Sequence, residues 1–133
     1  MSAANIALVQ SLYAAFGRGE IATIIAGLAP DVDWVVNGRH KDYPLLGSWK
    51  GQSEVQKFFK LVAETENFSD FSPKDFHAAG DVVVVLGHYA GSVTKTGRNF
   101  SCDWAHVFTV RGGKVARFRE YTDTAQFAEA YRG

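Results

Sequence analysis

Two strand-like segments on either side of a glycine pair, in the last third of the chain, constrain the fold more than any other feature. Residues 99–110 and 114–122 alternate apolar and polar side chains, a period that is typical of β-strands with one buried face. Gly112 and Gly113 lie between them and accept the backbone angles of a tight turn. The sequence therefore predicts an antiparallel hairpin with an apolar inner face.

Two registers are open for this hairpin. In the first, a two-residue turn places Arg117 and Arg119 on the face that carries Trp104 and His106. In the second, Gly113 is the bulged residue of a three-residue loop, and the arginines leave that face. The inner face then consists of Trp104, His106, Phe108, Ala116, Phe118 and Glu120. A buried face selects the register that separates apolar from charged residues, so the second register is favoured.

The preceding hairpin, closed by a loop around Thr96, decides which face His88 occupies. A two-residue turn would require Thr96 at positive φ, which a β-branched residue avoids. A bulged three-residue loop removes this strain and pairs His88 with Trp104. The sequence therefore predicts that His88 shares the inner face with Glu120.

Helical periodicity dominates the first half of the chain. Apolar side chains recur every three or four residues, Gly17 and Pro30 end helical segments, and Ser53–Gln56 has the form of a capping box. Helices are predicted over residues 6–16, 21–28 and 53–62, with a short one from residue 123. Strands are predicted over residues 32–36, 71–79, 82–94, 99–110 and 114–122, and a loop over residues 38–50. Helices followed by hairpins predict an α+β fold in which three N-terminal helices pack on a mostly antiparallel sheet.

Size and charge exclude several classes of function. With 133 residues the chain is predicted to form a single domain, residues 1–133, which can bury a core without metals or disulfides. The formal net charge is zero and the Lys and Arg residues are scattered, so a nucleic-acid partner is not expected. No apolar run is long enough to cross a membrane, so a membrane partner is not expected either.

Cysteine and histidine usage argues against disulfides and metals. Cys102 is the single cysteine, and the four His residues lack the spacing of a metal motif. The sequence contains no Gly-rich phosphate loop, and neither a metal nor a cofactor is expected. The first residues lack the layout of a signal peptide, which favours a cytoplasmic protein.

Glu120 and His106 are the candidate catalytic residues. A carboxylate on an apolar face must be paired, protonated or solvated in a cavity. The favoured register separates Glu120 from Arg117 and Arg119, so a catalytic acid or base is weighed against a structural ion pair. His106, diagonally near Glu120, is either a proton shuttle or a hydrogen-bonded core histidine.

Aromatic residues are numerous, with ten Phe, five Tyr and three Trp, and they indicate a pocket for a small apolar ligand. The predicted ligand-binding residues are Tyr13, Trp34, Phe58, Phe59, His88, Trp104 and Phe118. Aromatic side chains on an inner face also fill ordinary cores, so a lined cavity and a filled core both stay open.

Three local patterns resemble the nuclear-transport-factor-2-like superfamily, specifically its SnoaL-like polyketide cyclase and ketosteroid-isomerase-like group. They are residues 29–34 (Ala-Pro-Asp-Val-Asp-Trp) after two helices, residues 51–59 at the start of a third, and residues 106–115 running into residues 118–123. The resemblance covers essentially the whole chain. It implies a curved sheet wrapped around helices into a cone whose open end is a pocket, and a homodimer formed through the sheet.

The site residues of this family carry over only in part. Glu120 stands at the position of the acid/base carboxylate on the last strand of SnoaL-type cyclases. Val36 stands where steroid isomerases have their base, so steroid isomerisation is not expected, and Val36 is assigned to the pocket wall. The tyrosine of the first helix falls at Leu12, next to Tyr13, and the second oxyanion acid falls at His106.

Three functions stay open, and the third of them is a dimeric interaction module whose outer sheet face, including Asp103 and Arg119, recognises another protein. The first is a cofactor-independent enzyme of the isomerase or cyclase type that acts on a small apolar carbonyl compound. In it, Glu120 moves a proton next to the carbonyl group and His106 stabilises the enolate oxygen. The second is a non-catalytic protein that binds a small apolar ligand in the same fold.

Overall fold

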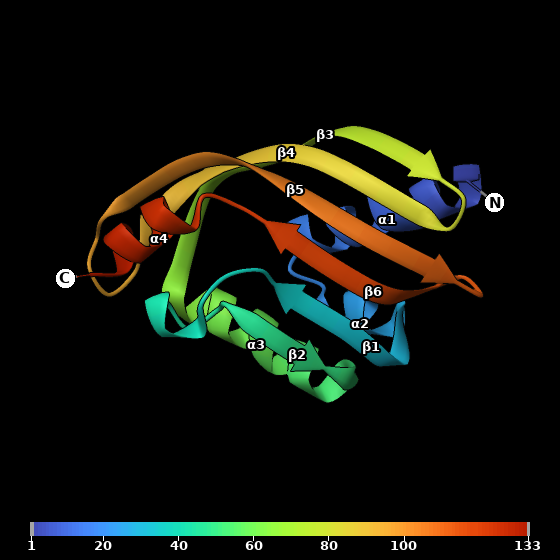
Figure 1. The fold of residues 1–133 in the computed structure, drawn as a ribbon, viewed down its shortest axis with the longest axis horizontal. Coiled ribbons are helices and arrows are strands. Elements are labelled where there is room, and N and C mark those ends of the chain that lie inside the picture. Colours follow the sequence, from blue (N-terminus) through green and yellow to red (C-terminus); the bar gives the residue numbers. More distant parts are fainter. Residues whose placement is uncertain (1, 133) are drawn as a thin grey trace.

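The computed structural model describes residues 2–132, which form a curved six-stranded sheet with three helices against its concave side (Figure 1). The helices are α1 (Ser2–Gly17), α2 (Ile21–Ala26), α3 (Gly51–Thr65) and α4 (Thr124–Tyr131). The strands are β1 (Leu28–Val36), β2 (Gly47–Lys50), β3 (Glu66–Ala79), β4 (Val82–Val93), β5 (Asn99–Arg111) and β6 (Lys114–Tyr121), and a short 3-10 helix (His40–Asp42) precedes β2. No helix of residues 2–132 combines the length and the apolar character needed to span a membrane.

The predicted α+β class is confirmed, with three helices before the long hairpins. The strand order is β2-β1-β6-β5-β4-β3, and all neighbours are antiparallel except β1 and β6. These two strands run in parallel, with Trp34 beside Phe118 and Val36 beside Glu120. The fourth helix, α4, packs against β4 and β5 at one end of the sheet (Figure 1).

The core lies between the concave face of the sheet and the helices. Helix α3 presents Val55, Phe59 and Val62 on one face, at the spacing of an amphipathic helix. The ring centroid of Phe59 lies 5.5 Å from that of Trp34 on β1, and Trp34 stacks on Phe118 of β6 at 3.8 Å. Aromatic rings therefore hold α3 against the sheet and also form the wall of the space beneath it.

The second helix is shorter than predicted because the chain turns into the sheet. Helix α2 ends at Ala26, and the Val115 N–H donates to the Gly27 carbonyl at 2.9 Å. This bond directs the next residues along β6, so Pro30 lies within β1 and does not simply end a helix.

Two predictions for the middle of the chain are also wrong. Residues 38–50 were expected to form a loop, but they contain strand β2, which pairs with β1. The capping box at Ser53 does not form, because α3 already begins at Gly51. The Glu54 carboxylate instead accepts a hydrogen bond from the Lys50 N–H at 2.7 Å. This bond gives a partner to one of the backbone N–H groups at the start of the helix.

The last hairpin has the predicted inner face but a different turn. Gly112 and Gly113 both have positive φ, 58° and 74°, and form a two-residue turn with Arg111 opposite Lys114. The extra residue lies further along, at Ala116, where a bulge in β6 shifts the register. The bulge at Ala116 therefore places His106, Phe118 and Glu120 on one face of the sheet, as the predicted bulged loop would also have done.

This shift changes which side chains lie opposite one another. The expected register placed Glu120 opposite Trp104, whereas in the structure Glu120 lies opposite His106. Phe108 and Phe118 form the next inward-facing pair. Directly opposite residues on one face approach closely enough for their side chains to hydrogen-bond.

The loop between β4 and β5 is longer than predicted. The Val93 N–H donates to the Arg98 carbonyl at 2.9 Å, and the Gly97 N–H donates to the Val93 carbonyl at 2.8 Å. These bonds close a four-residue loop, so His88 pairs with Asp103. The prediction that His88 lies on the inner face is wrong, because a register shift of one residue moves a side chain to the opposite face.

Candidate functional site

An apolar pocket opens between the helices and the concave face of the sheet. Its empty space is about 770 Å³, including the solvent at its mouth. Eight of the predicted site residues line this pocket: Tyr13, Trp34, Val36, Phe58, Phe59, His106, Phe118 and Glu120. Trp104 does not line the pocket, and His88 lies on the outer face of the sheet.

Three of the lining side chains form a hydrogen-bonded chain. Tyr13 Oη lies 2.7 Å from His106 Nδ1, and His106 Nε2 lies 2.8 Å from Glu120 Oε1. Because a carboxylate only accepts, the imidazole donates from Nε2 and accepts the Tyr13 hydroxyl at Nδ1. His106 is only 4% exposed, and both of its nitrogens are nevertheless satisfied within the protein.

Trp104 packs against the ring of His106. Its ring stacks on that of His106, with centroids 3.9 Å apart and an interplanar angle of 21°. Gly87 lies opposite Trp104 on β4, and a Cβ at this position would overlap with the indole ring. The absence of a side chain at Gly87 therefore makes room for the ring that positions His106.

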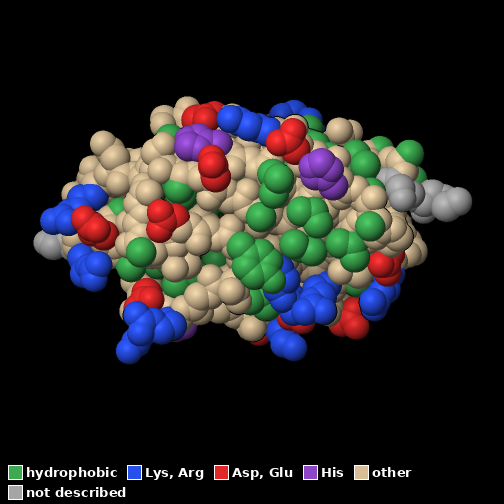
Figure 2. Space-filling model, turned by 45° about the horizontal axis from the view of Figure 1, so that its top comes forward, with side chains coloured by type: hydrophobic (Ala, Val, Ile, Leu, Met, Phe, Trp, Pro, Cys, Tyr) green, Lys and Arg blue, Asp and Glu red, His purple; other side chains and the backbone are tan. Residues whose placement is uncertain are grey.

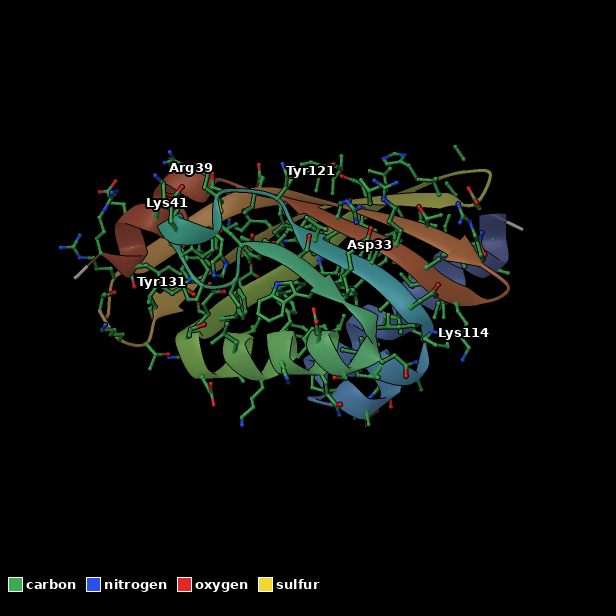
Figure 3. All side chains as sticks on the ribbon, turned by 60° about the horizontal axis from the view of Figure 1, so that its bottom comes forward. Asp33, Arg39, Lys41, Lys114, Tyr121 and Tyr131 are labelled. Carbon is green, nitrogen blue, oxygen red and sulfur yellow. The ribbon has the colours of Figure 1, made fainter. Side chains whose placement is uncertain are left out.

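Within residues 2–132, Glu120 does not form an ion pair with an arginine. The hydrogen-bond partners of its carboxylate among residues 2–132 are His106 and Tyr89. The Arg119 guanidinium instead binds Asp33 at 3.0 Å and holds the pKa of that carboxyl below its usual range. Figure 3 labels Asp33 on β1, the strand beside β6.

The second oxygen of Glu120 is less firmly held. Tyr89 Oη lies 3.4 Å from Glu120 Oε2 but only 2.6 Å from Thr122 Oγ1. A phenol has one hydrogen to donate, and the shorter contact with Thr122 takes it. Glu120 Oε2 is therefore the oxygen that remains available to a ligand.

Burial keeps the phenols beside Glu120 neutral. It raises the pKa of Tyr13 and of Tyr89 far above the usual range, and the negative charge of Glu120 raises both further. Both hydroxyls therefore remain hydrogen-bond donors at every pH at which the protein would be studied.

A second carboxylate, which the sequence interpretation missed, lines the same pocket. Glu66 is 6% exposed, and its Oε2 accepts a hydrogen bond from Tyr131 Oη of α4 at 2.7 Å. Figure 3 labels Tyr131 near the end of α3, where Glu66 follows. The sequence held a signal, because Glu66 continues the apolar spacing of Val55, Phe59 and Val62.

The described residues provide neither a metal site nor an activated thiol. No three His, Cys, Asp or Glu side chains within residues 2–132 come together as metal ligands would. Cys102 is buried with its Sγ 3.6 Å from Thr122 Oγ1, and burial raises the pKa of the thiol. A raised pKa disfavours the thiolate that a nucleophile requires.

Known proteins share this architecture over nearly the whole chain. A family model described as a SnoaL-like domain matches residues 9–118. An uncharacterized protein of Mycobacterium tuberculosis is 29% identical over 126 residues, which is 92% of each chain. An NTF2-like protein of Burkholderia xenovorans is 34% identical with a TM-score of 0.89, covering 98% of this chain and 97% of its own. TerC, co-crystallized with polyporic acid, is 30% identical with a TM-score of 0.86, covering 98% of this chain and 99% of its own.

Proposed function

The chain belongs to the family of SnoaL-like domains, and on this basis we propose that it is a cofactor-independent enzyme acting on a small apolar carbonyl compound. The hydrogen-bonded chain of Tyr13, His106 and Glu120 on the wall of an apolar pocket carries this proposal. A carboxylate with one oxygen fixed and the other open to a ligand has the arrangement that a general base requires. The crystallization of TerC with polyporic acid supports a small-molecule ligand.

The proposed reaction is a proton transfer. Glu120 Oε2 removes a proton from the carbon next to the carbonyl group, and the electrons of the C–H bond pass to the carbonyl oxygen to form an enolate. The protonated Glu120 then exchanges its proton with solvent and returns a hydron to the same carbon, or delivers the proton to a conjugated carbon and so completes an isomerisation. Atoms and charge balance without a co-reactant.

Within this proposal, His106 positions the two groups that act on the substrate. Both of its nitrogens are engaged, so the enolate oxygen cannot bind it without displacing Tyr13 or Glu120. The Tyr13 hydroxyl can instead rotate from His106 Nδ1 onto the enolate oxygen. Tyr13 thereby takes the oxyanion role that the sequence suggested for His106.

Hydrogen–deuterium exchange at carbon tests the proposal without knowledge of the natural substrate. We expect α-tetralone in deuterated buffer to lose its α-protons over many turnovers per protein molecule, above the rate in buffer alone. The exchange is measured by NMR, and binding is followed by tryptophan fluorescence, because Trp34 lines the pocket.

A non-catalytic binding protein is the second candidate function. The observation that favours it is the complete pairing of the His106 nitrogens within the protein, which also suits a rigid binding wall. Saturable binding of a panel of ketones with no exchange in any of them would contradict the enzyme and leave this candidate.

We further propose a homodimer formed through the outer face of the sheet. Leu86 and Tyr121 are 42% and 46% exposed, and Ala105 lies between them in the sheet. Val84 and Val107 pair in the neighbouring row. Figure 2 shows hydrophobic side chains gathered on this face between charged groups. A patch of this kind is typical of protein–protein interfaces.

Charged residues in this patch should separate the protomers. We expect Leu86→Glu combined with Tyr121→Glu to convert a dimer into a folded monomer, because each protomer would bury two carboxylates in the interface. Sedimentation velocity measures the change, with Lys57→Glu on an exposed position of α3 as the control. A wild-type protein that sediments as a monomer at high concentration would contradict the dimer.

The cytoplasm is the proposed location of the protein. Cys102 is a free thiol, and the sequence contains no second cysteine with which it could form a disulfide. Fractionation of cells that express the protein tests this location.

A further inference from the structure

One end of the pocket contains a carboxyl group that the proposed reaction does not use. Glu66 stands where α3 ends and β3 begins, on the pocket wall. Helix α4 covers this end, since Phe127 lines the pocket and Tyr131 donates to Glu66. The ring of Tyr43 stacks on both aromatic residues of α4, with centroids 5.4 and 5.0 Å apart. The end of the pocket is therefore an aromatic cap with one acid in it.

The two oxygens of Glu66 have different surroundings. Oε2 accepts the Tyr131 hydroxyl at 2.7 Å, and the same hydroxyl lies 3.2 Å from Thr65 Oγ1. No group in residues 2–132 forms a hydrogen bond with Oε1. An accessible carboxyl oxygen without a protein partner, on a largely buried side chain in the wall of a pocket, is a binding position for a ligand atom.

The surroundings of Glu66 favour its neutral form. Burial raises the pKa of Glu66 to about 7, the hydrogen bond from Tyr131 opposes this rise, and the negative charge of Glu120 adds to it. The titratable groups that act on this carboxyl are Tyr131 from α4, Tyr43 from the segment before β2, and Glu120 from β6. None of the three carries a positive charge that would hold Glu66 ionised.

We propose that Glu66 is a second ligand-binding residue, whose neutral carboxyl donates a hydrogen bond from Oε1 to an acceptor oxygen of the ligand. This inference rests on the proposed function, because it requires the same pocket to hold the ligand. Tyr131 fixes the direction of the donor by occupying Oε2. Glu66 does not touch the reacting carbon; it binds a second oxygen of the ligand beneath the aromatic cap.

The proposal defines the ligand more closely than the pocket alone does. The substrate class is an apolar ketone with a second acceptor oxygen, such as an ether, ester or second carbonyl, separated from the reacting carbonyl by an apolar ring. A carboxylate at that end of the ligand would compete for the same proton and be repelled once Glu66 ionises. Neutral acceptors are therefore preferred.

Matched probes test this role. Binding of α-tetralone, which has one oxygen, is compared by tryptophan fluorescence with binding of chromanone and methoxytetralone, which carry a second. We expect at least one two-oxygen probe to bind wild-type protein roughly three- to tenfold more tightly at about pH 6. The advantage should disappear at about pH 8.5, as the carboxyl loses its proton on passing its pKa.

Variants separate donation from structural support. Glu66→Gln should retain much of the advantage at both pH values, because an amide donates without titrating, whereas Glu66→Met should abolish it. Glu64→Met, at an exposed position near the end of α3, should behave as wild type. The pH dependence in the wild-type protein is informative even if Glu66→Met does not fold.

The outcomes distinguish the two proposals. If α-tetralone undergoes exchange and all probes bind equally at both pH values, Glu66 has no recognition role and the proposed reaction stands. If the two-oxygen probes bind with the expected pH dependence but nothing undergoes exchange, Glu66 recognises the ligand of a binding protein. If no probe binds at either pH, both the Glu66 role and the proposed carbonyl substrate are overturned.

Discussion

Replacing Glu120 with Gln should reduce the turnover number for deuterium exchange at least about a hundredfold, the lower range for loss of a general base. The amide can still accept the His106 Nε2–H that now reaches Glu120 Oε1 at 2.8 Å, so the hydrogen-bonded chain and the fold should survive. The amide cannot accept a proton from carbon. Exchange kinetics on α-tetralone measure the loss, and fluorescence titration checks that the ligand still binds.

A matched variant separates this effect from a general change of charge. Glu129→Gln removes one carboxylate from an exposed position of α4 and should leave exchange unchanged. A Glu120→Gln protein that exchanges at the wild-type rate would remove Glu120 from the chemistry, whatever its affinity for the ketone.

Gly87→Ala should be strongly destabilising, lowering the free energy of unfolding by about 2–3 kcal/mol. The new Cβ would overlap with the Trp104 ring and lie 2.7 Å from the Ser72 carbonyl oxygen, which belongs to the backbone of the neighbouring strand. Trp104 is 3% exposed and stacks on His106, so it cannot yield without moving the imidazole. Thermal denaturation should show a Tm lower by roughly 10 °C.

Another glycine provides the control for this substitution. Gly17, the last residue of α1, has no atom within 4 Å of a built Cβ. Gly17→Ala should therefore be neutral or slightly stabilising, because alanine loses less backbone entropy on folding. Equal stability of the Gly87→Ala and Gly17→Ala proteins would show that the indole has room to move.

The inward position of Glu120 and His106 could be predicted because alternation is a local property of a strand. Arg117 and Arg119 cannot share a buried apolar face with Trp104, and this requirement selected the correct face despite the wrong turn. The location of the bulge did not affect the result. A bulge in the loop and a bulge at Ala116 have the same effect on which side faces inward.

The face of His88 could not be predicted because it depends on the length of one loop. The hydrogen bonds between Val93 and Arg98 and between Gly97 and Val93 close four residues, where the sequence suggested three. The apolar and polar alternation of the strand does not show on which face His88 lies. On the outer face its side chain finds a partner, with Nδ1 2.8 Å from Asp103 Oδ1. A polar residue is accommodated on either face if it finds a partner.

Glu66 and strand β2 were missed for a different reason, which is that both depend on distant parts of the chain. The apolar spacing of α3 points Glu66 inward, but its hydrogen-bond partner Tyr131 comes from the last helix. Strand β2 is short and forms through its pairing with β1, including Trp49 opposite Trp34. Local periodicity contains no information about either contact.

The parallel pairing of β1 with β6 determines when the pocket can exist during synthesis of the chain. Residues 28–36 leave the ribosome early, yet their partner strand comprises residues 114–121. Until β6 is synthesised, the wall formed by Trp34 has no Phe118 to stack on, and its apolar surface has no sheet to join. Contacts so distant in sequence form slowly, and the exposed strand is open to aggregation meanwhile. Nascent chains that stall before β6 should therefore depend on chaperones.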